Sequence, residues 1–413
     1  MAPSGTVAIV PIQSRTRSPL STSYDVAIVG GGAIGSAIAY FLKADPMFDG
    51  SVAVIERDPT YAQASSALSA SSIRQQFSTP ENIRMSRFGI GFLREIDRHL
   101  GLGDGTPVDI GLHEGGYLYL ATAMFEEALR ANHAIQVAEG ADVVLLRPDE
   151  IESRFPWMSI EDVALGSLGL SGEGWFDGYG LMQAFRRKAR ALGAEFLAAE
   201  VDGLEVDGDR VTRLRLRDGQ TAEAGHVVNA AGPWSGAVAA MAGVELPVEA
   251  RRRCVFGFHA QATVPDCPLV IDTSGIWFRP EGEGFITAIS PRPEEDLDGL
   301  PLTVDQRLFD DRIWPALATR VPAFDSIKVR NAWAGYYEYS TFDRNAIIGP
   351  HPELANLLFA TGFSGHGIQH APAVGRAIAE LIVAGRYTTL DLGIFGYQRL
   401  REGRRVIERN VIG

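Results

Sequence analysis

The sequence predicts an α/β protein in which one parallel sheet is assembled from segments far apart in the chain, together with a strand-rich second domain. Three observations support this fold class. Residues 24–56 show the pattern of a strand, a helix and a second strand. Apolar runs typical of buried parallel strands return at residues 227–232 and 357–361. Residues 244–339 instead contain several short strands, which we interpret as the second domain.

The N-terminal elements follow from the hydrophobic pattern. YDVAIVG (residues 24–30) and SVAVIE (51–56) are short apolar runs with β-branched residues, as expected for buried strands. Residues 31–42 between them are expected to form a helix with small residues on its first turns. A Ser/Ala-rich stretch at residues 63–72 precedes a helix near residues 80–100.

The rest of the chain alternates between the two patterns. In chain order we expect strands at 115–120 and 142–146, a helix at 181–192, strands at 195–206 and 211–216 joined by a turn at 207–208, a strand at 227–232, strands at 254–259, 275–279 and 284–289, a strand at 357–361 and a helix at 367–384. Nucleotide-binding segments thus occur at the start, middle and end of the chain. This order predicts a discontinuous domain.

Length and composition limit the possible classes of protein. The 413 residues are 46% hydrophobic and 22% charged, which suits two globular domains or one large domain with insertions. The net charge of −13 disfavours nucleic acid and anionic membranes as partners. No run of about 18 apolar residues occurs, so we expect no transmembrane helix.

The two cysteines, Cys254 and Cys267, cannot form a disulfide framework, and no Cys/His spacing indicates zinc or another metal. A reducing compartment fits this cysteine content. Residues 1–23 contain no acidic residue and two arginines. We interpret them as a disordered leader of a cytoplasmic protein. A transit peptide for the mitochondrial matrix is the alternative.

The strongest motif is GGGAIG at residues 30–35, between a strand and a helix. In a dinucleotide-binding turn, Gly30 would permit the tight bend, Gly32 would let the backbone approach a diphosphate, and Gly35 would let helix and strand pack closely. The helix start would bind the diphosphate through free N–H groups. Glu56, which ends the next strand, would accept hydrogen bonds from ribose hydroxyls. A glycine-rich turn with a chance acid is the alternative.

A second motif, TGFSGHG at residues 361–367, also lies between a strand and a helix. Its glycines would let a flat ring system approach the backbone, and the helix start would favour negative charge, as on the N1–C2=O edge of reduced flavin. A hydrolase nucleophile elbow does not fit, because position 366 is histidine where that motif needs glycine. A plain turn with a solvent-facing histidine is the remaining alternative.

With these motifs the chain resembles the D-amino-acid oxidase and sarcosine oxidase superfamily of FAD enzymes. The resemblance rests on YDVAIVGGGAIGSAIAYFL, on VVNAAGPWS (227–235) and on FATGFSGHGIQHAPAVGRAIAELI (359–382), and it covers the chain after residue 23. SIRQQFSTPENIRMS (72–86) and WAGYYEYSTFDRN (333–345) are similar to the subgroup of the mitochondrial FAD-dependent oxidoreductase domain-containing protein.

The resemblance implies two domains. A Rossmann-like FAD-binding domain would comprise residues 24–105, 167–243 and 341–413. An α+β substrate domain with a large antiparallel sheet would comprise residues 106–166 and 244–340 and would cover the isoalloxazine ring. Motifs and resemblance together place FAD, held non-covalently, on Gly30, Gly32, Ala33, Ile34, Gly35, Glu56, Arg57, Ser65, Ser66, Ser69, Ala70, Ser71, Ser72, Val201, Ala231, Gly232, Gly362, Phe363, Ser364, Gly365, His366, Gly367 and Ile368.

Three residues are implied at the substrate site. Arg74 falls where monomeric sarcosine oxidase has an arginine that binds the substrate carboxylate, a natural partner for a guanidinium. A structural salt bridge, to a residue such as Glu81, is the alternative. Gln369 stands where sarcosine oxidase has a second carboxylate-binding group, a lysine. Tyr337 stands where glycine oxidase has an arginine, and it would shape the pocket or pack in the core with its neighbouring tyrosines.

These departures imply that the second carboxylate contact is either missing or replaced, with Arg253 or Arg279 as the candidates, which counts against a simple α-amino acid as substrate. Gly335 replaces the cysteine that sarcosine oxidase bonds to flavin. No histidine near the N-terminal motif corresponds to the attachment site of dimethylglycine-type enzymes, so FAD should be non-covalent. No lysine occurs at residues 285–289 to match the oxygen-activating lysine of sarcosine oxidase, which favours a dehydrogenase over an oxidase.

The activity implied is hydride transfer from a C–H next to an amine nitrogen to flavin N5, which gives an imine that water hydrolyses. The substrate would be an amino acid or an N-substituted amino acid, and the acceptor oxygen or an electron carrier. Two alternatives stay open. The protein could be a flavin-containing assembly or binding factor with little turnover, or it could oxidise a 2-hydroxy acid.

Overall fold

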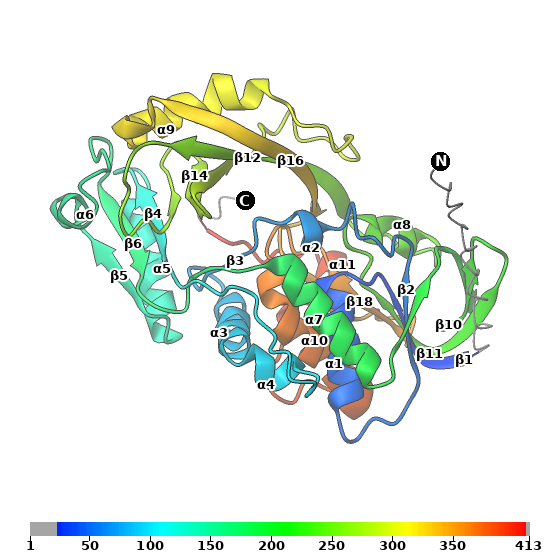
Figure 1. Ribbon diagram of the computed structural model, residues 1–413. Helices are drawn as coiled ribbons and strands as arrows, with labels where there is room; N and C mark the ends of the chain where they lie inside the picture. Colours follow the sequence, from blue (N-terminus) through cyan, green and yellow to red (C-terminus); the bar gives the residue numbers. More distant parts are fainter. Residues whose placement is uncertain (1–22, 410–413) are drawn as a thin grey trace, which may run out of the picture.

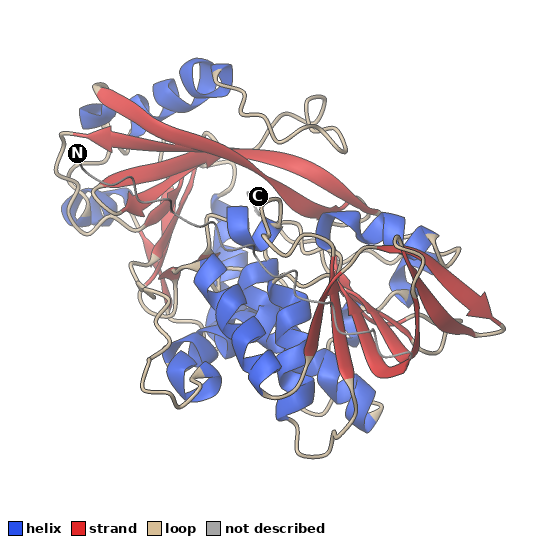
Figure 2. Cartoon of the chain, turned by 45° about the vertical axis from the view of Figure 1, so that its right-hand side comes forward, coloured by secondary structure: helices blue, strands red, loops and turns tan. Residues whose placement is uncertain are grey.

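The computed structural model describes residues 23–409, which form two large sheets on different sides of a central group of helices (Figures 1 and 2). The first sheet contains β1 (Ser23–Val29), β2 (Val52–Glu56), β8 (Glu195–Ala198), β9 (Val201–Asp207), β10 (Arg210–Leu216), β11 (Thr221–Asn229), β17 (Ile347–Pro350) and β18 (Leu357–Thr361). Its order is β17-β18-β11-β1-β2-β8, with β10 and β9 joined through β11. From β18 to β8 all neighbours are parallel.

The central strand β1 explains this order. It pairs with β2 on one side and with β11 on the other, and Val26, Ala27 and Ile28 are fully buried. A strand buried on both faces reads as an uninterrupted apolar run, which is why YDVAIVG predicts it. The segments that form this sheet come from the start, middle and end of the chain, as predicted.

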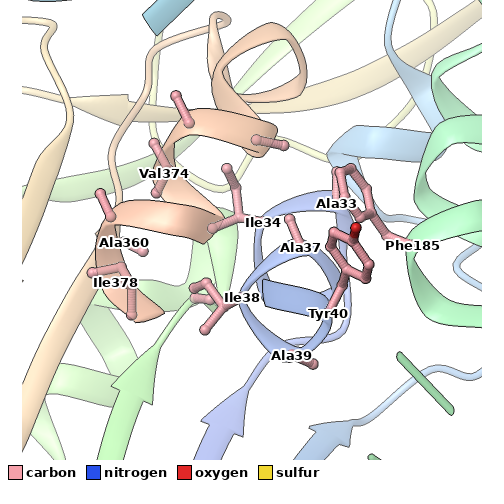
Figure 3. Packing of buried hydrophobic residues seen from close by; sticks show 14 of the residues in the cluster. Ala33, Ile34, Ala37, Ile38, Ala39, Tyr40, Phe185, Ala360, Val374 and Ile378 are labelled. Atoms are coloured by element: carbon pink, nitrogen blue, oxygen red, sulfur yellow. The ribbon is translucent and has the colours of Figure 1, made fainter. Parts of the chain in front are cut away.

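The helices that cover the first sheet pack tightly through small residues. They are α1 (Ala33–Ala44), α3 (Pro80–Arg94), α4 (Ile96–Leu100), α7 (Gly178–Ala191), α8 (Ser235–Ala240), α10 (Gly367–Ala384) and α11 (Gln398–Arg401). Figure 3 shows α1 between α10 and α7, with Ile34 and Ile38 towards α10 and Tyr40 towards Phe185 of α7. A Cβ at Gly375 of α10 would lie 2.8 Å from the Cβ of Ala37, so this close helix contact requires glycine.

The second sheet contains β4 (Tyr117–Ala121), β5 (Val143–Leu146), β6 (Leu165–Gly169), β12 (Val248–Ala260), β13 (Leu269–Ile271), β14 (Ile276–Glu281), β15 (Gly284–Ile289) and β16 (Ile327–Ser340). Its order is β16-β12-β15-β14-β13-β4-β6-β5, and every pair except β13–β4 is antiparallel. The long strands β12 and β16 pass above α2 (Ser65–Leu68) in Figure 1. The predicted fold class is therefore confirmed.

The remaining elements lie at the edges of these layers. They are β3 (Ser72–Ile73), which pairs with β7 (Gly174–Trp175), and α5 (Glu126–Ala138), α6 (Pro148–Arg154) and α9 (Trp314–Arg320), which belong to the second domain. Within residues 23–409, no helix combines the length and the apolar character that a bilayer-crossing segment needs.

The structure corrects several predicted boundaries. The helix near residues 80–100 is two helices, because Glu95 leaves the helical conformation at φ −110°. The strand at 195–206 is also two: β8 extends the parallel sheet, while β9 pairs with β10. The domain boundary at 166 falls inside β6, which belongs to the second sheet through Gly169. Ser23 is part of β1, and the rest of the predicted leader, residues 1–22, lies outside the described residues.

Candidate functional site: two clefts that meet at the start of α1

Two clefts adjoin each other between the two domains. The first, here called the sheet cleft, lies at the carboxyl ends of β1, β2 and β11 and has a volume of about 590 Å³. The second, the interdomain cavity, has a volume of about 140 Å³ and lies between the start of α10 and strands β12 and β16. Both clefts are lined by Ala33, Ile34, Ser65, Ser66 and Glu338. An elongated ligand can therefore occupy both.

The glycines of the GGGAIG motif shape the sheet cleft as the spacing predicts. Gly30 has a φ of 103°, and a Cβ there would lie 2.3 Å from the carbonyl oxygen of Ala230. A Cβ at Gly35 would lie 1.9 Å from the carbonyl oxygen of Gly30. Among the described residues, the N–H groups of Gly32 and Ile34 have no protein acceptor. Free donors at the start of a helix are suited to a diphosphate.

Glu56 lies at the end of β2 in the sheet cleft. Its Oε2 accepts a hydrogen bond from the N–H of Gly31 at 2.8 Å, and its Oε1 accepts one from the N–H of Asp58 at 2.8 Å. Each carboxylate oxygen can accept a second hydrogen bond, so contacts with ribose hydroxyls remain possible for the bound carboxylate. The other residues predicted here also line this cleft: Arg57, which stacks on Trp234 at 3.7 Å, and Val201, Ala231 and Gly232.

The Ser/Ala-rich segment passes along both clefts. Ser65 and Ser66 lie on α2, where the Ser65 hydroxyl donates to the carbonyl oxygen of Tyr336 at 2.6 Å and Ser66 Oγ accepts from the N–H of Ala33 at 3.0 Å. These bonds tie α2 to β16 and to α1. The predicted residues that follow, Ser69, Ala70, Ser71 and Ser72, line the interdomain cavity.

The TGFSGHG segment divides into two parts. Gly365, His366, Gly367 and Ile368 line the interdomain cavity, as predicted. Gly362, Phe363 and Ser364 line neither cleft. Phe363 is buried in the core beneath the loop, and Ser364 Oγ accepts a hydrogen bond from the N–H of Ser340. These three residues support the loop.

The start of α10 offers free hydrogen-bond donors to the cavity. The helix has no side-chain cap, and no acidic residue occurs in its first turn. In the described part of the chain, the N–H groups of Gly367, Ile368 and Gln369 have no protein acceptor. Their donors and the helix dipole favour negative charge on a ligand in the cavity.

Arg74 lines the interdomain cavity and forms no salt bridge with the described residues. It is 6% exposed, and its Nη2 lies 2.9 Å from His366 Nε2. Among residues 23–409, no carboxylate oxygen lies within 4.0 Å of its guanidinium, and Nε has no hydrogen-bond partner. Glu81 instead lies 3.9 Å from Arg84, so the alternative of an Arg74–Glu81 salt bridge does not hold.

The two arginines expected to supply a second carboxylate contact are already neutralised. Arg253 lines the cavity, but it forms a two-pronged ion pair with Asp296 at 2.7 and 3.0 Å. Arg279 lies outside the cavity, where it binds Glu281 and donates to the carbonyl oxygen of Ala70 at 2.7 Å. Which group makes the second carboxylate contact stays a prediction. Asp296 lies in a loop 43 residues from Arg253, whereas Glu281 is two residues from Arg279 on β14.

Gln369 and Tyr337 both line the cavity, in roles that the sequence did not specify. The Oε1 of Gln369 accepts a hydrogen bond from the backbone N–H of Arg74 at 2.8 Å, so this side chain fixes the arginine's backbone. The ring of Tyr337 packs on the loop, since a Cβ at Gly365 would lie 2.5 Å from Cε2. Its other neighbour is Arg253, whose Cζ lies 5.0 Å from the ring centroid.

Two buried histidines stand behind Arg74. Burial, and then the charge of Arg74, hold the pKa of His366 well below its usual value. The same causes lower the pKa of His370 to about 3, and its Nε2 lies 3.1 Å from Ser86 Oγ. Both imidazoles are therefore neutral near pH 7, and neither adds to the positive charge in the cavity.

Two polar groups at the site were not predicted from the sequence. Glu338 lines both clefts, and burial raises its pKa to about 7. Tyr117 lines the cavity and donates to Ser72 Oγ at 2.5 Å. A signal for Glu338 was available, because it interrupts an aromatic strand, YYEY, with the only carboxylate of that run.

Neither Gly335 nor the first histidine of the sequence places a nucleophilic side chain in the clefts. Gly335 lines the cavity, and a Cβ there would lie 2.9 Å from Leu68 Cβ. The first histidine of the sequence is His99. It stacks on Phe92 from α4 and lines neither cleft. Within the described residues, no group of three or more His, Cys, Asp or Glu side chains could hold a metal ion.

These features fit an extended dinucleotide joined to a flat ring system. The sheet cleft supplies glycines, free helix donors and Glu56, and the cavity supplies a second helix start beneath a large antiparallel sheet. Fold and site together define a two-domain flavoprotein oxidoreductase. The chain belongs to the FAD dependent oxidoreductase (DAO) family, whose model matches residues 25–381. Its cofactor is FAD, as the sequence predicts.

Known proteins extend this likeness over nearly the whole chain. FAD-dependent oxidoreductase domain-containing protein 1 of Xenopus laevis is 45% identical over 422 residues, which cover 94% of this chain and 85% of the relative. Glycine oxidase of Bacillus licheniformis is 29% identical over 91% of this chain and 97% of its own length. The solved L-proline dehydrogenase from P. horikoshii superposes with a TM-score of 0.81 at 26% identity, over 94% of this chain and 100% of that one. The predicted family and enzyme class are confirmed.

Proposed function

We propose that this enzyme oxidises the C–N bond of an amino acid or an N-substituted amino acid. The observation that carries the proposal is that Arg74, buried at the cavity, has no carboxylate within 4.0 Å among residues 23–409. A buried guanidinium is unfavourable without an anion, and a substrate carboxylate supplies one with matching geometry. The paired states of Arg253 and Arg279 leave Arg74 as the available carboxylate anchor in the described part of the cavity.

The surrounding residues hold Arg74 ready for such a substrate. Gln369 fixes its backbone, and the neutral ring of His366 accepts a hydrogen bond from Nη2. One face of the guanidinium packs on Phe77, with Cζ at 4.6 Å from the ring centroid. Because these contacts add no negative charge, they orient the guanidinium and leave its charge for the ligand.

Bound FAD would accept the hydride from the carbon next to the amine nitrogen. The chain's own part is to bind and orient the substrate: Arg74 holds the carboxylate, and Tyr337 closes the cavity beside it. We identify no general base, since an amine bound in its neutral form needs none. The relatives named glycine oxidase and L-proline dehydrogenase act on carboxylated amines, which supports the same class of substrate here.

The same proposal covers how FAD is held and reoxidised. We propose that FAD is non-covalent, because Leu68 crowds the position of Gly335 and His99 lies away from both clefts. Among the described residues no lysine lines either cleft, which favours an electron carrier over oxygen as acceptor. Both cysteines are free and buried, which supports a location in a reducing compartment. We propose the cytoplasm, with the mitochondrial matrix as the alternative.

The test is anaerobic reduction of the bound flavin by a panel of D-, L-, N-methyl and other N-substituted amino acids. Reduction is measured as the loss of the flavin's visible absorbance. Each compound is paired with the amine that lacks the carboxylate and with the matching 2-hydroxy acid. Bleaching by the carboxylated amine alone supports the proposal. Bleaching by the hydroxy acid alone would overturn it, and full FAD occupancy without bleaching by any compound would favour an assembly or binding factor.

A further inference from the structure

The carboxyl group of Glu338 lies where the sheet cleft meets the interdomain cavity. It is the only charged side chain among the five residues that line both clefts, and it is 9% exposed. Its Oε2 accepts hydrogen bonds from Thr361 Oγ1 at 3.0 Å and from the N–H of Gly362 at 3.2 Å. Its Oε1 has no hydrogen bond to the described residues. That atom lies beside Gly367, where a Cβ would be 2.9 Å away.

The surroundings of Glu338 favour its neutral form. Burial raises its pKa to about 7, although the hydrogen bonds from Thr361 and Gly362 both lower it. Among residues 23–409, no Lys, Arg or His forms an ion pair with this carboxylate. Near neutral pH the group can therefore be converted between its two forms by a modest change in its surroundings.

FAD would bring negative charge to this place. Its dinucleotide part matches the sheet cleft and its ring system matches the interdomain cavity, so the segment that joins them passes the junction. That segment carries the ribityl hydroxyls and a phosphate. A carboxylate would repel the phosphate, whereas a neutral carboxyl group can donate a hydrogen bond through its free oxygen.

We propose that Glu338 binds the ribityl-phosphate segment of FAD as a neutral carboxylic acid, so that FAD binding is coupled to the uptake of one proton at this residue. The inference depends on the cofactor alone. It therefore stands or falls independently of the proposed substrate.

Other titratable groups face the same clefts from the neighbouring elements, and they must be distinguished from Glu338. In the interdomain cavity they are Arg74, Tyr117 on β4, Arg253 on β12, Tyr336 and Tyr337 on β16 and His366 before α10. In the sheet cleft they are Glu56, Arg57, Asp58, Tyr61, Glu200 and Arg217. His366 is already neutral near pH 7, because burial lowers its pKa.

The experiment measures the dissociation constant of FAD from the holoenzyme, by flavin fluorescence, between about pH 5.5 and 9. For one linked proton the dissociation constant rises as pH increases through 7, by at most about tenfold per pH unit. Glu338→Gln keeps an amide oxygen for Thr361 and Gly362 and cannot ionise. Its FAD affinity should equal that of the wild type at low pH and stay constant as pH rises.

Glu173→Gln is the matched control. Burial also raises the pKa of Glu173 to about 7, but this carboxyl group binds Gln75 and Gln76 and lines neither cleft. The control should keep the wild-type pH dependence of FAD affinity. Thr361→Val removes a hydrogen bond that lowers the pKa of Glu338, so the midpoint of the affinity curve should move to higher pH.

Two results would overturn the proposal. One is an unchanged pH dependence in folded Glu338→Gln protein. The other is a wild-type affinity that increases with pH, because an ionised Glu338 would then be accepting hydrogen bonds from the ribityl hydroxyls. Proton uptake measured with a pH indicator on FAD binding, in wild type and Glu338→Gln, separates these cases even if the variant is less stable.

Discussion

The sheet cleft and the interdomain cavity adjoin each other but are built in opposite ways. The sheet cleft depends on backbone groups: glycines that leave no room for a Cβ, and free N–H donors at the start of α1. The cavity depends on side chains from distant segments, which include Arg74, Tyr337 and Gln369. In the sheet cleft, a ligand would accept hydrogen bonds from the free N–H groups at the start of α1. In the cavity, a ligand would bring a negative charge to Arg74.

This difference explains what each region can recognise. Backbone donors and glycines bind a diphosphate that is the same in every FAD enzyme. An arginine that has no carboxylate partner among residues 23–409 would instead favour a variable ligand with an anionic group, as the proposed function requires. The predictions below test each half of this comparison, from the largest expected effect to the smallest.

Gly35→Ala should abolish FAD binding. A Cβ would lie 1.9 Å from the carbonyl oxygen of Gly30, so α1 must move away from β1, and the loss of unfolding free energy should be about 3 kcal/mol. Gly91→Ala on α3 is the control, because no atom lies within 4 Å of its Cβ. That change should raise helix stability by up to about 1 kcal/mol. Flavin content and melting temperature are measured together, and full flavin content in Gly35→Ala would contradict the packing argument.

Arg74→Ala should lower kcat/KM for a carboxylated amine by about 2–4 kcal/mol of transition-state binding, roughly 30- to 800-fold. Arg74→Lys keeps the charge without the planar fork and should fall between alanine and wild type. The control is the same amine without its carboxylate, for which Arg74→Ala should change little. An unchanged kcat/KM in folded, flavin-loaded Arg74→Ala would remove the carboxylate anchor from the proposal.

The neutral histidines behind Arg74 predict a pH effect on stability. Folding lowers the pKa of His370 from 6.5 to about 3, so protonation of this histidine favours the unfolded chain. The free energy of unfolding is therefore unaffected by His370 above pH 6.5 and decreases as pH falls from 6.5 towards 3. At pH 5 the loss should be about 2 kcal/mol. His370→Gln should lack this part of the slope in denaturant unfolding between about pH 5 and 8. An identical slope in the variant would show that His370 is not buried as a neutral group.

The comparison also explains which parts of the site could be predicted from sequence. Gly30, Gly35 and Glu56 act over short chain separations, and their spacing alone identifies the cleft. Arg253 forms its ion pair with Asp296, 43 residues along the chain, and tertiary packing decides whether this acid reaches the arginine. Sequence patterns therefore place Arg253 in the right domain but cannot say that it is paired.

The TGFSGHG segment shows the same limit on a smaller scale. All seven residues match the motif, but only those from Gly365 onward line the cavity, because the loop turns at Ser364 with a φ of 50°. Glu338 is the opposite case, because no motif predicted it and yet it lies at the site. Its carboxyl group lies at the junction of the clefts only because β16 crosses above α2, a long-range arrangement that no local pattern encodes.

The smallest effect should come from Glu56→Gln in the sheet cleft. Both carboxylate oxygens already accept hydrogen bonds from backbone N–H groups, those of Gly31 and Asp58. In the glutamine variant the side-chain NH2 group takes the place of one oxygen, so one of these two hydrogen bonds is lost. If Glu56 also accepts a ribose hydroxyl, the lost charge-assisted bond should weaken FAD binding by about 1.5 kcal/mol, roughly tenfold. FAD that lacks the adenosine 2′-hydroxyl separates the two contributions, because it should bind the wild type more weakly but bind Glu56→Gln as well as FAD does. Equal penalties for the missing hydroxyl in both proteins would mean that Glu56 only shapes the turn, and the ribose would then need another acceptor.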